Sequence, residues 1–258
     1  MNPSDFVKCY HGLTVTGRLG GTRTAQVYRY FMWGTKGLKK ADEIKAKLEK
    51  DTLREGEVKR LASVAQASLK DGLIRRIFEG KGSPSDIKTL LEAALISEEV
   101  PDDTDSLQAF CDESIGVDCS GFVNAYFRTM NWIGESQSIL DLVRGQRKDP
   151  TRIQPRDVLY WYSKVSETGK LLPTPDTGKV GHIAVVDSPP VSTGDGLGTM
   201  TVCESRGGGI GISTNQYSIK ELLKDDDDHV IYRIDCSLKG LTKSKTDRDN
   251  YVRVYPCP

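Results

Sequence analysis

The sequence has no apolar run of about 18 residues, the length that a membrane-spanning helix needs. Its 36 basic and 36 acidic residues balance, so no net charge attracts the protein to nucleic acid or to an anionic membrane surface. The first 30 residues lack the basic start and apolar core of a secretory signal, and we expect synthesis in the cytoplasm. These absences favour a soluble globular protein without a nucleic-acid partner.

Cysteine and histidine are both scarce. The chain has six cysteines, none in a Cys-x-x-Cys pair, so zinc binding is not indicated and we expect neither a metal nor another cofactor. Cys236 and Cys257 flank the C-terminal segment and could form a disulfide in an oxidising compartment. Only His11, His182 and His229 are available as histidine bases.

The segment with the clearest chemical meaning is residues 116–123, Gly-Val-Asp-Cys-Ser-Gly-Phe-Val. A thiol at a helix N-terminus lies beside unpaired backbone N–H groups and the positive end of the helix dipole, which favour the nucleophilic thiolate. Asp118 is suited to capping this helix, and Gly121 lets another segment or a substrate backbone come close. The alternative for Cys119 is a buried structural cysteine. Apolar residues recur at helical spacing after Cys119 and predict that it shares the inward face: Phe122, Val123, Tyr126, Phe127 and Met130.

His182 and Glu204 lie in two apolar runs that follow the cysteine segment. Residues 181–186, Gly-His-Ile-Ala-Val-Val, have strand character and are opened by a glycine. A lone histidine there is usually structural, but an earlier helix-start cysteine makes His182 the candidate general base. Residues 201–205 form a second strand-like run containing Glu204, which could hold the imidazole in the required tautomer. The alternative for Glu204 is a surface residue of an edge strand.

These segments, in this order, resemble the NlpC/P60 peptidases within the papain-like cysteine peptidase superfamily. Residues 118–123 resemble the family's Asp-Cys-Ser-Gly-Phe-Val helix start, and residues 181–186 resemble its Gly-His-apolar strand. Glu204 falls at the family's third polar position, where many relatives carry histidine, asparagine or glutamine. Residues 154–161 resemble the Pro-Gly-Asp turn and strand found between helix and histidine, with Arg156 in place of the usual glycine.

The resemblance implies an α+β papain-like core over residues 105–258, in which the cysteine helix packs on a mainly antiparallel sheet. It implies Cys119 as nucleophile, His182 as base and Glu204 as third catalytic residue, with the Cys119 N–H in an oxyanion hole. The implied substrate is an amide bond in the peptide stem of bacterial peptidoglycan, often next to a D-amino acid. Expected substrate contacts come from residues that flank these positions: Asp118, Ser120, Gly181 and Ser205.

The pattern of residues 1–104 predicts a helical N-terminal region, which could be an independent domain, a lid over the cleft or an elaboration packed on the core. The last is favoured, since no Pro/Gly-rich linker separates the region from Cys119. Residues 36–76 hold twelve lysines and arginines against seven acidic residues. Apolar residues recur there with the periodicity of an amphipathic helix: Val58, Leu61, Ala62, Ala65, Leu69 and Leu73. In the simplest interpretation, the charged residues form the solvated face of this helix. The alternative interpretation is that they bind a polyanion. A further helix is predicted by residues 83–86, Ser-Pro-Ser-Asp, which supply a cap, a first-turn proline and an acid. Its expected apolar face is Ile87, Leu90, Leu91, Ala94 and Leu95.

The remaining segments predict loops and a last strand. Residues 163–179 and 188–198 are rich in turn formers, and in a papain-like arrangement they would rim the cleft and select the substrate. The acidic run 225–228 predicts a solvated turn instead of a calcium loop, because its carboxylates are consecutive and not at alternating ligand spacing. We expect His229, beside this run, to be a surface residue and not a catalytic one. Residues 246–255 predict a loop and a strand that closes or extends the sheet.

The expected function is a cell-wall cysteine endopeptidase or amidase. Without a signal peptide, such an enzyme would leave its producer through a dedicated secretion system, with a phage, or by lysis. An antibacterial effector of this kind fits the resemblance, and an immunity or inhibitor protein is then a candidate partner. Two alternatives stay open: a papain-like hydrolase or acyltransferase acting on a cytoplasmic protein or lipid, and a catalytically inert binding module of the same fold.

Overall fold

The computed structural model describes residues 1–18, 20–30, 35–52, 56–69, 71–161, 181–192, 197–224, 230–236 and 250–258. It is an α+β protein whose contacts divide it into two compact units. The helical unit comprises residues 6–125 and 205–212, and the barrel unit comprises residues 1–5, 126–204 and 213–258.

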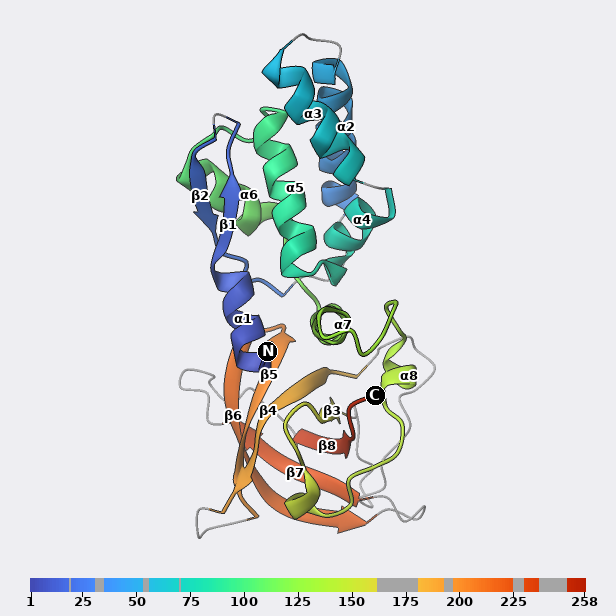
Figure 1. Cartoon of the computed structure of the whole chain (residues 1–258). Helices are drawn as coiled ribbons and strands as arrows, with labels where there is room; N and C mark the ends of the chain where they lie inside the picture. The colour runs from blue at the N-terminus through green and yellow to red at the C-terminus, as the bar shows by residue number, and fades with distance from the viewer. Residues whose placement is uncertain are drawn as a thin grey trace. The chain divides into compact units, whose positions relative to one another are not determined.

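The helical unit contains a group of helices and one β-hairpin. Its hairpin is antiparallel and pairs Leu13 with Ala25. Helix α5 contacts both α3 and β1, while α6 contacts β2, so the hairpin is covered by helices within this unit (Figure 1). The elements that lie wholly or mostly in this unit are α1 (Pro3–His11), β1 (Leu13–Thr16), β2 (Thr22–Ala25), α2 (Thr35–Thr52), α3 (Glu57–Ser68), α4 (Asp71–Arg76), the π-helix η1 (Ile77–Lys81), α5 (Pro84–Ile96), α6 (Thr104–Ser114) and α7 (Cys119–Thr129).

The predicted cap at the start of α5 is confirmed. The Ser83 hydroxyl accepts from the Asp86 N–H at 3.1 Å, and the Asp86 carboxylate accepts from the Ser83 N–H at 3.0 Å. Pro84 occupies the first helical turn, where its missing N–H costs no hydrogen bond. This capping box satisfies two of the donors that a helix start leaves unpaired. The helix buries the apolar face that the sequence predicted, with Ile87, Leu90, Leu91, Ala94 and Leu95 no more than 1% exposed.

The prediction of one amphipathic helix over residues 36–76 is wrong, because three helices occupy this segment: α2, α3 and α4. Gly56, which precedes α3, has φ 75°, in the left-handed region that a continuing α-helix does not enter. Leu69 then ends α3 with ψ 72°. Ala62, Ala65 and Leu69 are buried as their periodicity predicted. Leu61 and Leu73, which belong to the same pattern, are only half-buried. The pattern therefore identified part of the buried face and neither of the two breaks.

The barrel unit is built on a closed six-stranded barrel (Figure 1). Its neighbours are β3-β4-β5-β6-β7-β8, and β8 returns to pair with β3, where Val158 faces Tyr255. Antiparallel pairing agrees with the predicted sheet, and the last strand closes it. The elements lying wholly or mostly in this unit are α8 (Ile139–Leu142), η2 (Pro150–Arg152), β3 (Val158–Trp161), β4 (Ile183–Val191), β5 (Thr199–Arg206), β6 (Gly211–Lys224), β7 (Val230–Cys236) and β8 (Asn250–Tyr255).

The barrel core is apolar and is contributed by all six strands. Burial of these side chains is the main stabilising contribution to the barrel. Every member of the cluster is at most 6% exposed: Ile153, Leu159, Trp161, Ala184, Val186, Met200, Val202, Tyr217, Ile219, Val230, Tyr232, Ile234, Val252 and Val254.

The turn before β3 shows what Arg156 does in place of the expected glycine. Its φ is 79°, a left-handed conformation that glycine adopts without strain and other residues rarely do. Its N–H donates to the Val186 carbonyl at 2.6 Å, and its guanidinium lies 5.1 Å from the Trp132 ring centroid. The next residue, Asp157, is buried and pairs with Arg147 at 3.0 Å. These contacts hold the turn in a conformation that would favour glycine.

Two sequence-based boundaries differ from the structure. The predicted loop at 188–198 is wrong for residues 188–191, which continue β4 through irregular pairing that accommodates Pro189 and Pro190. The division of the chain by contacts also does not coincide with the predicted boundary after residue 104, since the helical unit continues to residue 125. The predicted features at 163–179, 225–228, His229 and 246–249 lie outside the described residues.

Candidate functional site

Cys119 is the first residue of α7, as the sequence predicted. Asp118 caps this helix: its carboxylate Oδ1 accepts from the Gly121 N–H at 2.6 Å, and its carbonyl accepts from the Phe122 N–H at 2.9 Å. Phe122 and Val123 are fully buried, while Cys119 is partly exposed. The cap and the buried face together fix the thiol at a helix N-terminus, beside backbone N–H groups that have no partner within the helix.

Tyr30, which the sequence did not identify as a site residue, lies beside this cysteine within the helical unit. A parallel bridge joins Tyr30 to Val117, and the phenol hydroxyl hydrogen-bonds to the Cys119 side chain. Burial, the negative charges of Cys119 and Asp118, and this hydrogen bond raise the pKa of Tyr30 to about 12. The hydroxyl therefore stays protonated at neutral pH and can donate to a thiolate.

The Tyr30 phenol is expected to titrate near pH 12 instead of 10.0, its ordinary value. Cys119→Ala should lower this midpoint and still leave it above 10.0, because burial is the largest cause and remains. Carbon-13 NMR of tyrosine-labelled protein measures the midpoint, and Tyr30→Phe assigns the signal. A midpoint that does not respond to Cys119→Ala would contradict the proximity of the two side chains.

His182 and Glu204 form a close pair within the barrel unit. His182 Nε2 lies 2.5 Å from Glu204 Oε2, and the Glu204 side chain is completely buried. This burial excludes the alternative in which Glu204 is a surface residue. His182 directly precedes β4, so it lies just outside the strand in which the sequence placed it.

The backbone and one aromatic ring fix the position of His182. The Trp161 N–H donates to the His182 carbonyl at 2.8 Å, and the two ring centroids are 4.7 Å apart. Gly181 is buried, and a Cβ on it would lie 2.1 Å from the Trp161 carbonyl oxygen. Glycine is thus required for the close approach of these two segments.

Asn215 and Tyr217 hold the other oxygen of the Glu204 carboxylate. Asn215 Nδ2 donates to Glu204 Oε1 at 2.7 Å, and the Tyr217 hydroxyl donates to the same oxygen at 2.5 Å. Both residues are on β6 and are buried. The sequence does not identify them, because nothing local to β6 reveals which strand it pairs with or which carboxylate it faces.

This network determines which imidazole nitrogen is used for which contact. Glu204 engages His182 through Nε2, which favours the tautomer that carries its proton there. Nδ1 is then the ring nitrogen that can accept a proton from a nucleophile. A buried carboxylate fixed by two donors can orient the imidazole and stabilise its protonated form.

The predicted substrate-contacting residues have different surroundings. Ser120 is partly exposed, and its hydroxyl donates to Asp118 Oδ1 at 3.0 Å. Ser205 is fully buried and donates to the Val117 carbonyl at 2.5 Å, so its hydroxyl is used to hold the segment before Cys119. Of the two predicted serines, only Ser120 therefore has a hydroxyl that solvent can reach.

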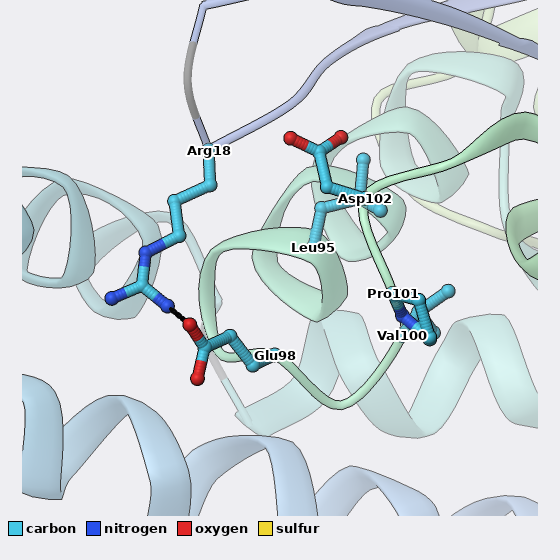
Figure 2. A pocket seen from close by; sticks show the side chains of 6 residues that line it. All are labelled: Arg18, Leu95, Glu98, Val100, Pro101 and Asp102. Atoms are coloured by element: carbon cyan, nitrogen blue, oxygen red, sulfur yellow. Dashed lines mark hydrogen bonds and ion pairs between the residues drawn. The ribbon is translucent and has the colours of Figure 1, made fainter.

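Other described features do not add a site. A pocket in the helical unit is lined by six residues that include none of the predicted site residues, and Arg18 pairs with Glu98 beside it (Figure 2). The six cysteines, all within the described residues, form no disulfide. Across the described ranges, no three His, Cys, Asp or Glu side chains are grouped as metal ligands. None of the described helices combines the length and apolarity needed to cross a membrane.

Comparisons with known proteins do not identify a family for this chain. No family model matches the chain, and neither a curated protein nor a solved structure matches it.

Proposed function

We propose that the protein is a cysteine hydrolase with an NlpC/P60-type papain-like core, which cleaves amide bonds. Cys119 is the nucleophile, His182 the general base and Glu204 the group that orients His182. The observation that carries the proposal is the buried His182–Glu204 pair, 2.5 Å between Nε2 and Oε2, with Asn215 and Tyr217 fixing the carboxylate. A carboxylate fixed in this way can hold the imidazole in one tautomer and stabilise its protonated form, as a general base requires.

The reaction is acyl transfer in two steps. His182 Nδ1 takes the Cys119 proton, and the thiolate attacks the amide carbonyl carbon to form a tetrahedral intermediate. The Cys119 N–H is a donor for its oxyanion, and Tyr30 is a donor for the thiolate. His182 then protonates the leaving amine, the C–N bond breaks and a thioester remains. Water, deprotonated by His182, hydrolyses the thioester and restores the thiol.

The proposed substrate is the peptide stem of bacterial peptidoglycan, and it rests on the resemblance of the cysteine and histidine segments to NlpC/P60 peptidases. The proposed place of action is the cell wall or periplasm, reached by a dedicated secretion system, a phage or lysis. Under this proposal an immunity or inhibitor protein is a candidate partner.

Digestion of peptidoglycan tests this proposal. Purified sacculi and soluble muropeptides are incubated with wild type, with Cys119→Ala, and with Cys257→Ala as a control that removes another partly exposed thiol. Mass spectrometry of the products identifies any cleaved bond. We expect new stem-peptide fragments from wild type and Cys257→Ala, and none from Cys119→Ala, because only the last lacks the nucleophile.

Two other outcomes would overturn this proposal, each in a different way. If wild type releases nothing while Cys119 reacts much faster with iodoacetamide than free cysteine does, the nucleophile is real but the substrate is not peptidoglycan. A cytoplasmic protein or lipid substrate then becomes the better hypothesis. If Cys119 reacts no faster than free cysteine and nothing is cleaved, the fold serves binding and the catalytic proposal is wrong.

A further inference from the structure

The segment that precedes α5 packs its backbone directly against the start of α7. Gly80, inside η1, has φ 78° and ψ 22°, a left-handed conformation that turns the chain out of the helix. Its carbonyl accepts from the Asp118 N–H at 2.9 Å. A Cβ on Gly121 would lie 2.0 Å from the same carbonyl oxygen, so only glycine at 121 permits this contact. The two glycines thus bring residue 81 next to Cys119's neighbours.

Lys81 contacts the residues on both sides of Cys119. Its ammonium forms an ion pair with Asp118 Oδ2 and donates a hydrogen bond to the Ser120 hydroxyl. Ser120 in turn donates to Asp118 Oδ1, which completes a three-membered network. The Lys81 side chain is 33% exposed and that of Asp118 only 12%, so solvent screens this ion pair less than a surface pair.

The charge of Lys81 bears on the thiolate. Asp118 is the helix cap, and its carboxylate places a negative charge next to Cys119 that opposes formation of a second negative charge there. Lys81 neutralises this carboxylate. Among the described contacts of the helical unit, three groups act on the thiol or on the residues beside it: the Asp118 carboxylate, the Lys81 ammonium and the Tyr30 hydroxyl.

We propose that Lys81 is a positioning residue for the nucleophile: it fixes Asp118 and Ser120 around Cys119 and cancels the charge of the cap. This inference assigns a task to the helical N-terminal region, and it rests on the proposed function in that Cys119 is taken as the nucleophile. A capping carboxylate without a cation would hold the helix but disfavour the thiolate. With Lys81, the same carboxylate caps the helix without that effect.

The test is the pH profile of Cys119 alkylation by iodoacetamide, followed by peptide mass spectrometry from pH 5 to pH 10. Lys81→Met and Lys81→Gln are expected to slow alkylation at pH 7 by about tenfold and to displace the profile to higher pH, because a cation close to the thiolate is lost. Lys81→Arg keeps the charge and should stay within about threefold of wild type. Lys88→Met, which breaks the Lys88–Glu92 ion pair of the same unit, should leave the profile unchanged.

Two buried thiols serve as internal references. Burial raises the pKa of both Cys111 and Cys203 to about 12, so neither should be labelled at pH 7 while the protein is folded. Their labelling in any variant reports unfolding. Lys81→Gln retains a hydrogen-bonding group, and it remains informative if Lys81→Met does not fold.

The inference is overturned if folded Lys81→Gln or Lys81→Met keeps the wild-type alkylation profile, or if Lys81→Arg behaves like Lys81→Met. Muropeptide cleavage measured in parallel separates this failure from failure of the proposed function. If the profiles shift while wild type cleaves nothing, Lys81 positions a reactive thiol and the hydrolase proposal fails. If wild type cleaves and the profiles coincide, the hydrolase stands and the role of Lys81 is refuted.

Discussion

His182→Ala should lower kcat/KM for stem-peptide cleavage by at least about 10³-fold, because the thiol then lacks its base and the leaving amine its proton donor. Glu204, at 2.5 Å, and the Trp161 ring hold the imidazole in place. No other residue of this network is a base suited to take the thiol proton at neutral pH. Cys119→Ala should cost a comparable factor. The double variant is expected to be no slower than the slower single variant, since residues that act as a unit lose their joint contribution once.

His11→Gln is the control for this experiment. His11 is in the helical unit, where Nε2 lies 3.0 Å from the Ile212 carbonyl oxygen, and burial lowers its pKa. Its replacement should change kcat/KM by less than about threefold, because it is not part of the proposed acid–base step. Additive losses from Cys119→Ala and His182→Ala would show that the two residues act independently, which would contradict a shared catalytic step.

Gly121→Ala is expected to destabilise the helical unit by about 3 kcal/mol, at the upper end of the usual cost of overpacking. The new Cβ would lie 2.0 Å from the Gly80 carbonyl oxygen and 3.0 Å from the Lys81 Cα, both of them backbone atoms. Since no flexible side chain can move aside, the backbone of one segment has to shift. Differential scanning calorimetry of the full chain measures the loss as a lower Tm, and alkylation measures the effect on Cys119.

Gly72→Ala is the matched control. Gly72 is also a helical glycine of the helical unit, in α4, but a Cβ built on it meets nothing within 4 Å apart from its chain neighbours and the nearby backbone of its own helix. Alanine there should leave stability unchanged or raise it by up to about 1 kcal/mol, since alanine is the better helix former. If Gly121→Ala were as well tolerated as Gly72→Ala, the close packing of η1 on α7 would be refuted.

Local signals in the sequence predicted the parts of the site that depend on neighbouring residues. The start of α7 at Cys119 follows from an apolar period after a capping aspartate, and the start of α5 follows from a capping box. Gly121 was expected to allow a close approach, and the Gly80 carbonyl occupies that position. Each of these features is encoded within about ten residues of chain.

The other parts depend on pairings between distant segments, which periodicity cannot specify. Tyr30 lies beside Cys119 because its segment bridges to Val117, and Asn215 and Tyr217 reach Glu204 because β5 neighbours β6. The two breaks between α2 and α4 were missed for another reason: an apolar period can continue in phase across a short interruption. Closure of the sheet into a barrel requires a register that no single strand reveals.

Pairing of β3 with β8 also has a consequence for folding kinetics. Val158 meets Tyr255, a residue that follows about 100 positions later in the chain, so this ladder forms only after a long loop has closed. Such non-local pairing gives the barrel a high contact order, and proteins of this kind fold in milliseconds to seconds instead of microseconds. During synthesis, β3 can pair with β4 early, but its other edge stays without a partner strand until β8 leaves the ribosome seconds later.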